Sequence, residues 1–181
     1  MAKVVLVLCH PNYQNSLANK AVVDKLKTLI PNLEFDHIDK LYPDYKIDVK
    51  KEQEKLKKAD SIILQFPMFW YNAPSLLRKW FEDVLAHGFA YGSEGTALKG
   101  KKLIISWTMG SPDDVYKEKL SGENLATGFG ALAKLCNMVY VGEFHTAGVM
   151  YFIKDKPDVL KKKMEELGKQ AEKVAEAAKK K

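Results

Sequence analysis

Four short apolar runs constrain the fold of this chain more than any other feature. They are rich in β-branched residues, end in turn-forming residues, and occupy residues 3–10, 61–66, 102–108 and 138–146. Uninterrupted apolar runs of this length are typical of strands buried on both faces of a parallel sheet. A fifth run, residues 33–38, alternates between apolar and polar residues, which predicts a strand at an edge of the sheet.

Segments with helical spacing separate these runs. One apolar stripe extends from Ala18 to Leu29, and another extends from Leu77 to Leu85. Alternation of strands and helices predicts a parallel sheet with right-handed crossovers and helices on both faces. No linker or repeat interrupts the pattern. We therefore expect one α/β domain over residues 1–181, a flavodoxin-like three-layer sandwich with five parallel strands in the order 2-1-3-4-5.

The net charge of +6 does not indicate a nucleic-acid partner, because most of it lies in one segment. Residues 154–181 contain ten lysines and six acids, and their apolar residues recur every three or four positions. This pattern predicts an amphipathic helix with a solvated lysine face. The chain has a single arginine, Arg78, whereas readout of base edges relies on arginine.

The composition also indicates where the protein is located and whether it binds a metal ion. No apolar run approaches the roughly 18–20 residues that span a bilayer, and no leader pattern opens the chain, so we expect a soluble cytoplasmic protein. Cys9 and Cys136 lie in apolar runs, which predicts buried free thiols. The four histidines have no compact ligand spacing, so we expect no metal site.

The loops after the first, third and fourth strands are the place to look for a site, because ligands of open parallel sheets bind beyond the carboxyl ends of strands. The first loop, CHPNYQNSLANKAV, has neither of the common glycine-rich nucleotide motifs. It places His10, Asn15 and Ser16 just before a helix. Ser16 could complete a phosphate site at the helix start or could only cap the helix.

The second loop, FPMFWYNAPSLLRKW, is aromatic. Phe69, Trp70 and Tyr71 lie between Pro67, where the chain leaves the sheet, and Pro74, which is well placed to begin a helix. Rings in such a loop need something flat to cover. That partner could be a ligand or a second subunit.

The third loop, WTMGSPDDVY, combines Gly110 with the hydroxyls of Thr108 and Ser111. It could bring backbone close to a ligand or could be a plain turn. Asp113 and Asp114 follow a proline in this turn, where acids are favoured for structural reasons, so we do not expect them to be catalytic. Taken together, the three loops describe a site for a flat phosphorylated ligand, and flavin mononucleotide (FMN) meets all three demands.

Residues 66–92, FPMFWYNAPSLLRKWFEDVLAHGFAYG, resemble a segment typical of NAD(P)H:quinone oxidoreductases of the DT-diaphorase-like flavodoxin-fold family. The resemblance extends back to HPNYQNSLANKA and forward to LKGKKLIISWTMGSPDDVY, about two-thirds of the chain. In length and pattern the chain is similar to small bacterial members, which include the ancillary flavoproteins of glutathione-gated potassium efflux systems.

This resemblance implies a set of flavin contacts. Those to the phosphate and ribityl chain are His10, Ser16, Leu17 and Asn19. Those along the isoalloxazine are Pro67, Met68, Phe69, Trp70 and Tyr71, and those at its pyrimidine end are Thr108, Met109, Gly110 and Ser111. Tyr116 would also contact the flavin, above its substrate side, and would be the catalytic residue. Larger relatives carry a histidine six residues later, where this chain has Gly122.

The resemblance also implies the reaction. A flavin-dependent NAD(P)H dehydrogenase would take hydride from NAD(P)H and reduce a quinone or related acceptor by a two-electron ping-pong cycle. FMN is favoured over FAD, because the larger members hold FAD with a C-terminal extension. The family implies a homodimer whose cavity lies at the two-fold interface, with rings such as Phe89 and Tyr91 beside it. Azo- or nitroreductase activity, a regulatory role on a potassium efflux membrane protein, and either nicotinamide donor stay open.

Overall fold

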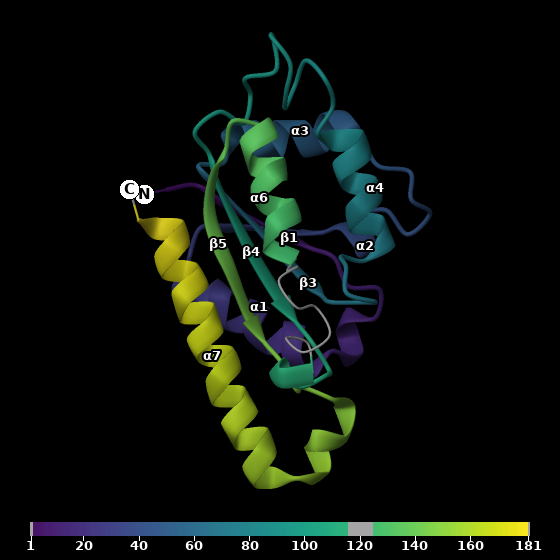
Figure 1. Cartoon of the computed structure of the whole chain (residues 1–181), viewed down its shortest axis with the longest axis vertical. Helices are drawn as coiled ribbons and strands as arrows, with labels where there is room; N and C mark the ends of the chain where they lie inside the picture. The colour runs from purple at the N-terminus through teal and green to yellow at the C-terminus, as the bar shows by residue number, and fades with distance from the viewer. Residues whose placement is uncertain (1, 116–124, 181) are drawn as a thin grey trace.

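The structure, a computed structural model, describes residues 2–115 and 125–180 (Figure 1). Five parallel strands form one sheet in the order β2-β1-β3-β4-β5, as predicted. The strands are β1 (Val4–Leu8), β2 (Leu33–His37), β3 (Ser61–Pro67), β4 (Lys102–Thr108) and β5 (Val139–Thr146). Residues of β1 and β3 are buried throughout, whereas β2 lies at an edge and is partly exposed. The alternating pattern therefore marked one edge strand correctly. The run at 138–146, which was predicted to be buried, forms β5 at the other edge and is partly exposed.

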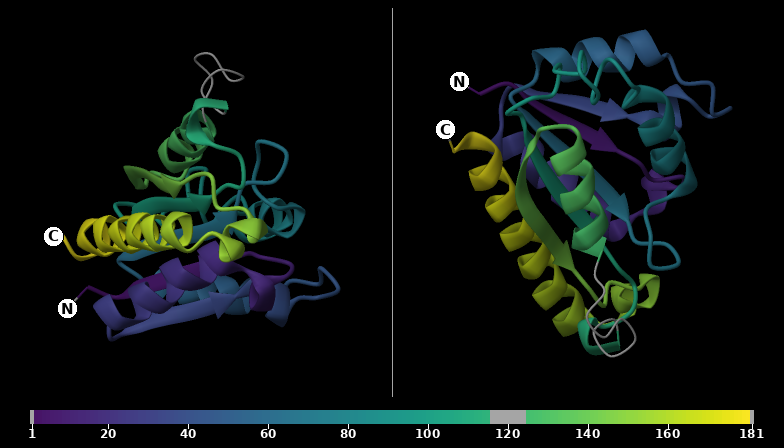
Figure 2. Two further views of the ribbon diagram at one scale, coloured as in Figure 1. Left: turned by 90° about the horizontal axis from the view of Figure 1, so that it is seen from below. Right: turned by 45° about the horizontal axis from the view of Figure 1, so that its top comes forward.

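Helices cover both faces of this sheet (Figure 2). The helical elements are η1 (Tyr13–Asn15), α1 (Leu17–Leu29), α2 (Ile38–Leu41), α3 (Val49–Lys58), α4 (Ser75–Val84), α6 (Leu125–Leu135), η2 (Tyr151–Asp155) and α7 (Pro157–Lys179). Alternate residues of β1 face two separate cores. Val4, Leu6 and Leu8 pack with α1 and α7, whereas Val5 and Val7 pack with α2, α3, α4 and α6. The three-layer sandwich follows from this alternation.

Because the crossovers join parallel strands, the helices run opposite to the strands and present their C-terminal carbonyls at the amino edge of the sheet. Helices α3 and α7 end at the amino edge, and lysines of the β4 start cap them there. Lys101 Nζ donates to the carbonyls of Lys57 (2.8 Å) and Ala59 (2.5 Å), and Lys102 Nζ donates to those of Ala177 (3.4 Å) and Lys180. Ammonium groups at helix C-termini satisfy free carbonyls and oppose the helix dipole.

Two further expectations about burial are met. Cys9 and Cys136 are buried free cysteines. The lysine-rich segment forms α7, whose apolar stripe from Leu167 to Ala178 is buried against α1 and the sheet. Within the described residues, no helix is both long and apolar enough to cross a membrane.

Candidate functional site

A cavity of about 350 Å³ opens at the carboxyl edge of the sheet, near the lower end of Figure 1. This volume falls in the range of roughly 300–1,000 Å³ that small-molecule sites occupy. Most of the residues singled out in the three loops line it: His10, Ser16, Leu17, Asn19, Pro67, Met68, Phe69, Thr108, Met109 and Gly110. The structure thus brings together residues up to a hundred positions apart in the sequence, and it does so at the predicted edge.

The end of the cavity formed by α1 suits an anion. Ser16 precedes the helix, and its Oγ accepts a hydrogen bond from the Asn19 backbone N–H at 3.2 Å. Leu17 and Ala18, in the first turn, line the cavity, and such first-turn N–H groups have no acceptor within their helix. Lys154 of η2 lines the same cavity. A helix start and a hydroxyl therefore lie together at this end, and an ammonium group borders the same cavity.

A buried amide network supports this end from behind. Asn19 Nδ2 donates to Thr108 Oγ1 at 2.8 Å and to Ser16 Oγ at 3.3 Å. Gln65 Nε2, from β3, donates to Asn19 Oδ1 at 2.8 Å. Gln65, Asn19 and Thr108 are all at most 3% exposed. The network therefore joins β3, β4 and the start of α1 into one rigid unit under the cavity.

His10 enters the cavity as a neutral imidazole. Burial lowers the pKa of His10, while the nearby Asp39 carboxylate acts in the opposite direction. Its Nδ1 accepts a hydrogen bond from the Asn12 backbone N–H at 3.1 Å, so the ring proton resides on Nε2. His10 can accordingly offer an N–H donor without adding a positive charge.

The aromatic loop turns sharply beside this cavity. Phe69 and Asn72 exchange backbone hydrogen bonds of 3.0 and 2.9 Å, and the two residues between them, Trp70 and Tyr71, have φ values of 50° and 60°. Positive φ at both central positions is the geometry of a type I′ turn, which normally requires glycine or asparagine. Phe69 lines the cavity, whereas Trp70 is 95% exposed and Tyr71 43% exposed, both outside the lining.

The third loop is held by the segment that follows β5. The Met109 N–H donates to the Thr146 carbonyl, and the Val149 N–H donates to the Met109 carbonyl, at 3.1 and 3.0 Å. A Cβ added at Gly110 would meet only Met150, at an ordinary 3.5 Å, so the chain's own packing does not require glycine there. Ser111 is exposed and outside the lining. Tyr116, like Gly122, lies outside the described residues.

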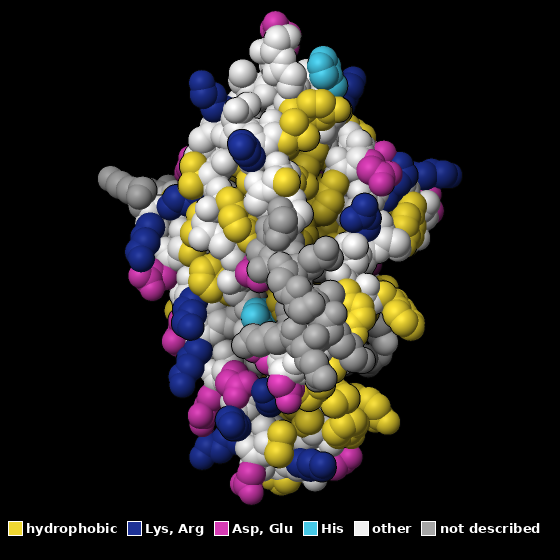
Figure 3. Space-filling model, viewed as in Figure 1, with side chains coloured by type: hydrophobic (Ala, Val, Ile, Leu, Met, Phe, Trp, Pro, Cys, Tyr) yellow, Lys and Arg dark blue, Asp and Glu magenta, His cyan; other side chains and the backbone are white. Residues whose placement is uncertain are grey.

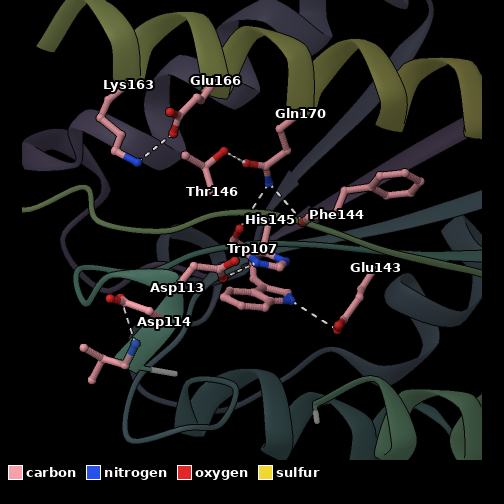
Figure 4. A network of polar contacts seen from close by, with 11 residues as sticks. Trp107, Asp113, Asp114, Glu143, Phe144, His145, Thr146, Lys163, Glu166 and Gln170 are labelled. Atoms are coloured by element: carbon pink, nitrogen blue, oxygen red, sulfur yellow. Dashed lines mark hydrogen bonds and ion pairs between the residues drawn. The ribbon is translucent and has the colours of Figure 1, made fainter. Parts of the chain in front are cut away.

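Side chains of β5 and α7 brace the same loop (Figure 4). The His145 ring stacks on Trp107 with a centroid distance of 4.0 Å, and its Nε2 lies 2.8 Å from Asp113 Oδ1. Asp114 Oδ1 accepts the Val115 N–H at 2.9 Å. On the opposite face, Gln170 of α7 donates to the Trp107 and Phe144 carbonyls, both at 3.1 Å. The two aspartates thus hold the turn.

Three lining residues come from a segment that the sequence reasoning did not consider. Val149, Tyr151 and Lys154 follow β5, whereas the sequence pointed only to the loops after the first, third and fourth strands. Tyr151 and Lys154, in the segment that follows the predicted strand at 138–146, were the available signal. Phe89, expected beside the cavity of a dimer, is only 8% exposed and packs into the core of its own chain.

A larger hollow, of about 740 Å³, lies at the amino edge among Lys99, Lys101, Lys102, Lys179 and Lys180. Lys101 and Lys102 donate there to helix-end carbonyls, so part of its charge has a structural explanation. It has neither a helix start nor an aromatic lining. Its size alone does not make it the ligand site.

Among the described residues, no group of histidine, cysteine and acidic side chains could hold a metal ion.

Comparison with known proteins is consistent with this geometry. The family described as having a flavodoxin-like fold matches residues 2–171. An uncharacterised NAD(P)H oxidoreductase, YrkL, of Bacillus subtilis (strain 168) is 33% identical over 157 residues, which cover 84% of this chain and 90% of the relative. The potassium-efflux ancillary protein KefF of Enterobacter sp. (strain 638) is 42% identical over 107 residues, or 59% of this chain and 60% of KefF.

Among solved structures, general stress protein 14 of Treponema denticola in complex with FMN superimposes with a TM-score of 0.85. It is 29% identical in sequence, and the match covers 97% of this chain and 99% of that protein.

Proposed function

The chain belongs to the flavodoxin-like fold family, and from this premise we propose that it is an FMN-dependent NAD(P)H oxidoreductase that reduces quinones or related acceptors. The observation that carries the proposal is the cavity at the carboxyl edge, with an anion-binding end at α1 and a ring, Phe69, at the aromatic loop. Two similar proteins support it: YrkL, whose name gives the donor class, and the Treponema protein, which holds FMN.

The residues present fit a phosphate at the α1 end. None of the described residues that line the cavity is acidic, while Lys154 adds a positive charge. The N–H groups of the first turn, the hydroxyls of Ser16 and Thr108, and the Nε2–H of His10 would supply donors to the phosphate oxygens. These groups are already positioned by the Asn19 network and by the Asn12 contact to His10.

The remaining lining residues would hold the ring system. Pro67, Met68, Phe69, Met109 and Gly110 supply flat apolar surface and backbone polar groups. When bound, the flavin would accept hydride from NAD(P)H and pass two electrons to the acceptor. The chain's task is to orient flat substrates, exclude water and place backbone N–H groups of residues 108–111 where negative charge develops. Tyr116 as a donor to the acceptor oxygen stays a prediction.

We further propose that the chain acts as a homodimer. Figure 3 shows hydrophobic side chains along a band near α4 and α6 and in a cluster near the lower end of the molecule. Trp70, Tyr151 and Leu135 are 95%, 83% and 60% exposed, which is unusual for large apolar side chains of a monomer. The connection between α4 and β4 leaves at the upper end of Figure 1, away from the cavity, so its half-buried Tyr91 could approach a flavin site only in a second chain.

A second candidate function is regulatory, and the similarity to KefF over 107 residues favours it. In that case the flavoprotein would dock on a potassium-efflux membrane protein and control it. Co-purification of such a membrane protein with this chain, and a loss of regulated efflux when the chain is removed, would support the regulatory role. Neither result would exclude turnover, because one flavin site could serve both.

The proposed activity is tested by two half-reactions under anaerobic conditions. Protein reconstituted with FMN is expected to lose its visible flavin absorbance on addition of NADPH or NADH, and to regain it when a quinone is added. FMN free in solution at the same concentration is the control. FMN-loaded protein that neither nicotinamide donor reduces would contradict the oxidoreductase proposal and leave the regulatory one.

A further inference from the structure

We infer that Gln65, acting through Asn19, orients the hydroxyl groups of Ser16 and Thr108 so that both donate hydrogen bonds to the phosphate of the ligand. The inference rests on the proposed function, because it assigns the anion-binding end of the same cavity. Gln65 does not line that cavity and lies behind Asn19, at 0% exposure, so it would be a positioning residue rather than a contact.

Gln65 sets the donor-to-acceptor direction of the hydrogen bonds in this network. Its Nε2 can only donate, and it donates to Asn19 Oδ1 at 2.8 Å. This bond holds the oxygen of the Asn19 amide toward β3. The Asn19 Nδ2 must then face the cavity side, where it donates to Thr108 Oγ1 at 2.8 Å and to Ser16 Oγ at 3.3 Å.

The proton of each hydroxyl is thereby left for the ligand. A hydroxyl has one proton to donate and two lone pairs that accept. Ser16 Oγ accepts from both the backbone N–H and Nδ2 of Asn19, so its lone pairs are used and its proton points elsewhere. Thr108 Oγ1 faces a donor in Asn19 and cannot donate back to it. Since both residues line the cavity, their protons are available there.

If the direction of these hydrogen bonds were reversed, the site would disfavour an anion. If the Asn19 amide were turned, its Oδ1 would accept the protons of both hydroxyls, and their lone pairs would face the cavity. A phosphate needs donors, and lone pairs would repel it. Within the described residues, the Oε1 atom of Gln65 has no hydrogen-bond partner, so the donor side of this glutamine is the side that the network uses.

The test compares two substitutions of Gln65 with a matched control. Gln65→Glu keeps the shape, but an ionised carboxylate only accepts, so it would turn the Asn19 amide. Gln65→Met removes the donor without reversing the polarity. Gln53→Met is the control, because Gln53 also donates through its Nε2, to the Val84 carbonyl at 2.9 Å, but lies outside the cavity and its supporting loops. Circular dichroism and melting temperature establish that each variant is folded.

The readout is the dissociation constant of FMN relative to that of riboflavin, which lacks the phosphate, measured by flavin fluorescence. At pH 8 we expect Gln65→Glu to lower the preference for FMN at least about tenfold, since charge-assisted hydrogen bonds are lost. Gln65→Met should lower it less, and Gln53→Met should leave it unchanged. At pH 5.5 the introduced carboxyl, once protonated, can donate to Asn19, so the preference should return toward that of the unsubstituted chain at the same pH.

Two outcomes would overturn the inference. In the first, folded Gln65→Glu and Gln65→Met prefer FMN as strongly as the Gln53→Met control at both pH values. In the second, the unsubstituted chain binds neither flavin, a result that removes the proposed function. In addition, inorganic phosphate either stabilises the unsubstituted chain and Gln65→Glu equally against thermal unfolding or stabilises neither. Stabilisation by inorganic phosphate that Gln65→Glu abolishes would retain the inference without the flavin.

Discussion

Among single residues, Trp70 and Tyr71 have the most unusual backbone conformation near the site. Both take positive φ, at 50° and 60°, and neither is glycine. The left-handed conformation costs an L-residue roughly 1–2 kcal/mol, and strain of this kind gathers at functional loops. Trp70 recovers little by packing, because it is 95% exposed. Its retention is explained if the ring meets a ligand, an acceptor or a second chain.

Trp70→Gly should therefore stabilise the chain while impairing function. Relief of the left-handed strain, less the greater unfolded-state entropy of glycine, predicts a gain of about 0.5–1 kcal/mol in the free energy of unfolding, measured with urea. Quinone turnover should fall. Tyr45→Gly is the matched control, since Tyr45 also has positive φ, at 64°, but belongs to a loop that contributes no residue to the cavity, whereas Trp70 adjoins the lining residue Phe69. Equal turnover in both variants would remove Trp70 from the site.

A second residue-scale feature is a buried acidic pair away from the site. Glu52 Oε1 and Asp36 Oδ1 lie 2.6 and 2.5 Å from Lys55 Nζ, and Glu52 also accepts from Tyr42 and Trp80. Burial, and next the Glu52 carboxylate, raise the pKa of Asp36 to about 7. Burial alone would raise the pKa of Glu52, but its hydrogen bonds bring it below the usual range. With one lysine beside two buried carboxyl groups, Glu52 is the carboxyl that ionises and Asp36 the one that tends to keep its proton.

This pair predicts a pH dependence of stability. Since the folded-state pKa of Asp36 lies above its unfolded value of 3.8, the stabilisation is full below that value and is lost as pH rises through about 7. Asparagine imitates the protonated acid. Asp36→Asn should match the unsubstituted chain within about 1 kcal/mol at pH 5 and exceed it by about 1–3 kcal/mol at pH 8. Urea unfolding at both pH values measures this, and equal differences at the two values would contradict it.

Among elements, the start of α1 has two tasks that a substitution can separate. Ser16 caps the helix, which is the simpler interpretation of the sequence, and it also lines the cavity. Aspartate caps a helix as well as serine but carries a negative charge. Ser16→Asp should change the free energy of unfolding by less than about 0.5 kcal/mol, yet weaken FMN binding tenfold or more through repulsion of the phosphate. Unchanged FMN affinity in this variant would mean that Ser16 is only a cap.

The sequence predicted the elements well where burial controls them. Strands β1, β3 and β4 appear as apolar runs because both of their faces are covered, and parallel strands bring their following loops to one edge. From that edge, ten of the residues in the three loops could be placed around one cavity. Alternation alone does not fix the strand order, because several doubly wound orders alternate in the same way, and the order 2-1-3-4-5 was expected as the flavodoxin-like one.

Other parts of the site depend on long-range contacts that no local pattern records. The turn at Trp70 forms against its glycine-free sequence, because Phe69 and Asn72 close it and Met68 is bonded to β4. The contribution of η2 depends on Gly148 and Val149 being bonded back to the third loop. Gln65 appeared to be one polar residue in a buried strand, and its partner, Asn19, is 46 positions away.

For the whole molecule, we predict a dimer in solution. Large exposed apolar side chains, including Trp70, Tyr151 and Leu135, would be covered by a second chain. Sedimentation equilibrium at micromolar concentration should give twice the 20.5 kDa of one chain. Introduction of a charge at one of these exposed apolar positions, as in Leu135→Lys at the end of α6, should shift the mass toward one chain if α6 takes part. If sedimentation equilibrium of the unsubstituted protein gave the mass of a single chain, the dimer would be removed from the proposal.

The central claim is that the cavity at the carboxyl edge of the sheet, and not the larger basic hollow at the amino edge, takes the phosphorylated flavin. A crystal structure of the complex with FMN tests this claim most directly. The account predicts the phosphate at the start of α1, within hydrogen-bond distance of Ser16 and Thr108, and the ring against Phe69. Electron density for FMN among Lys99, Lys101 and Lys179 instead would contradict it.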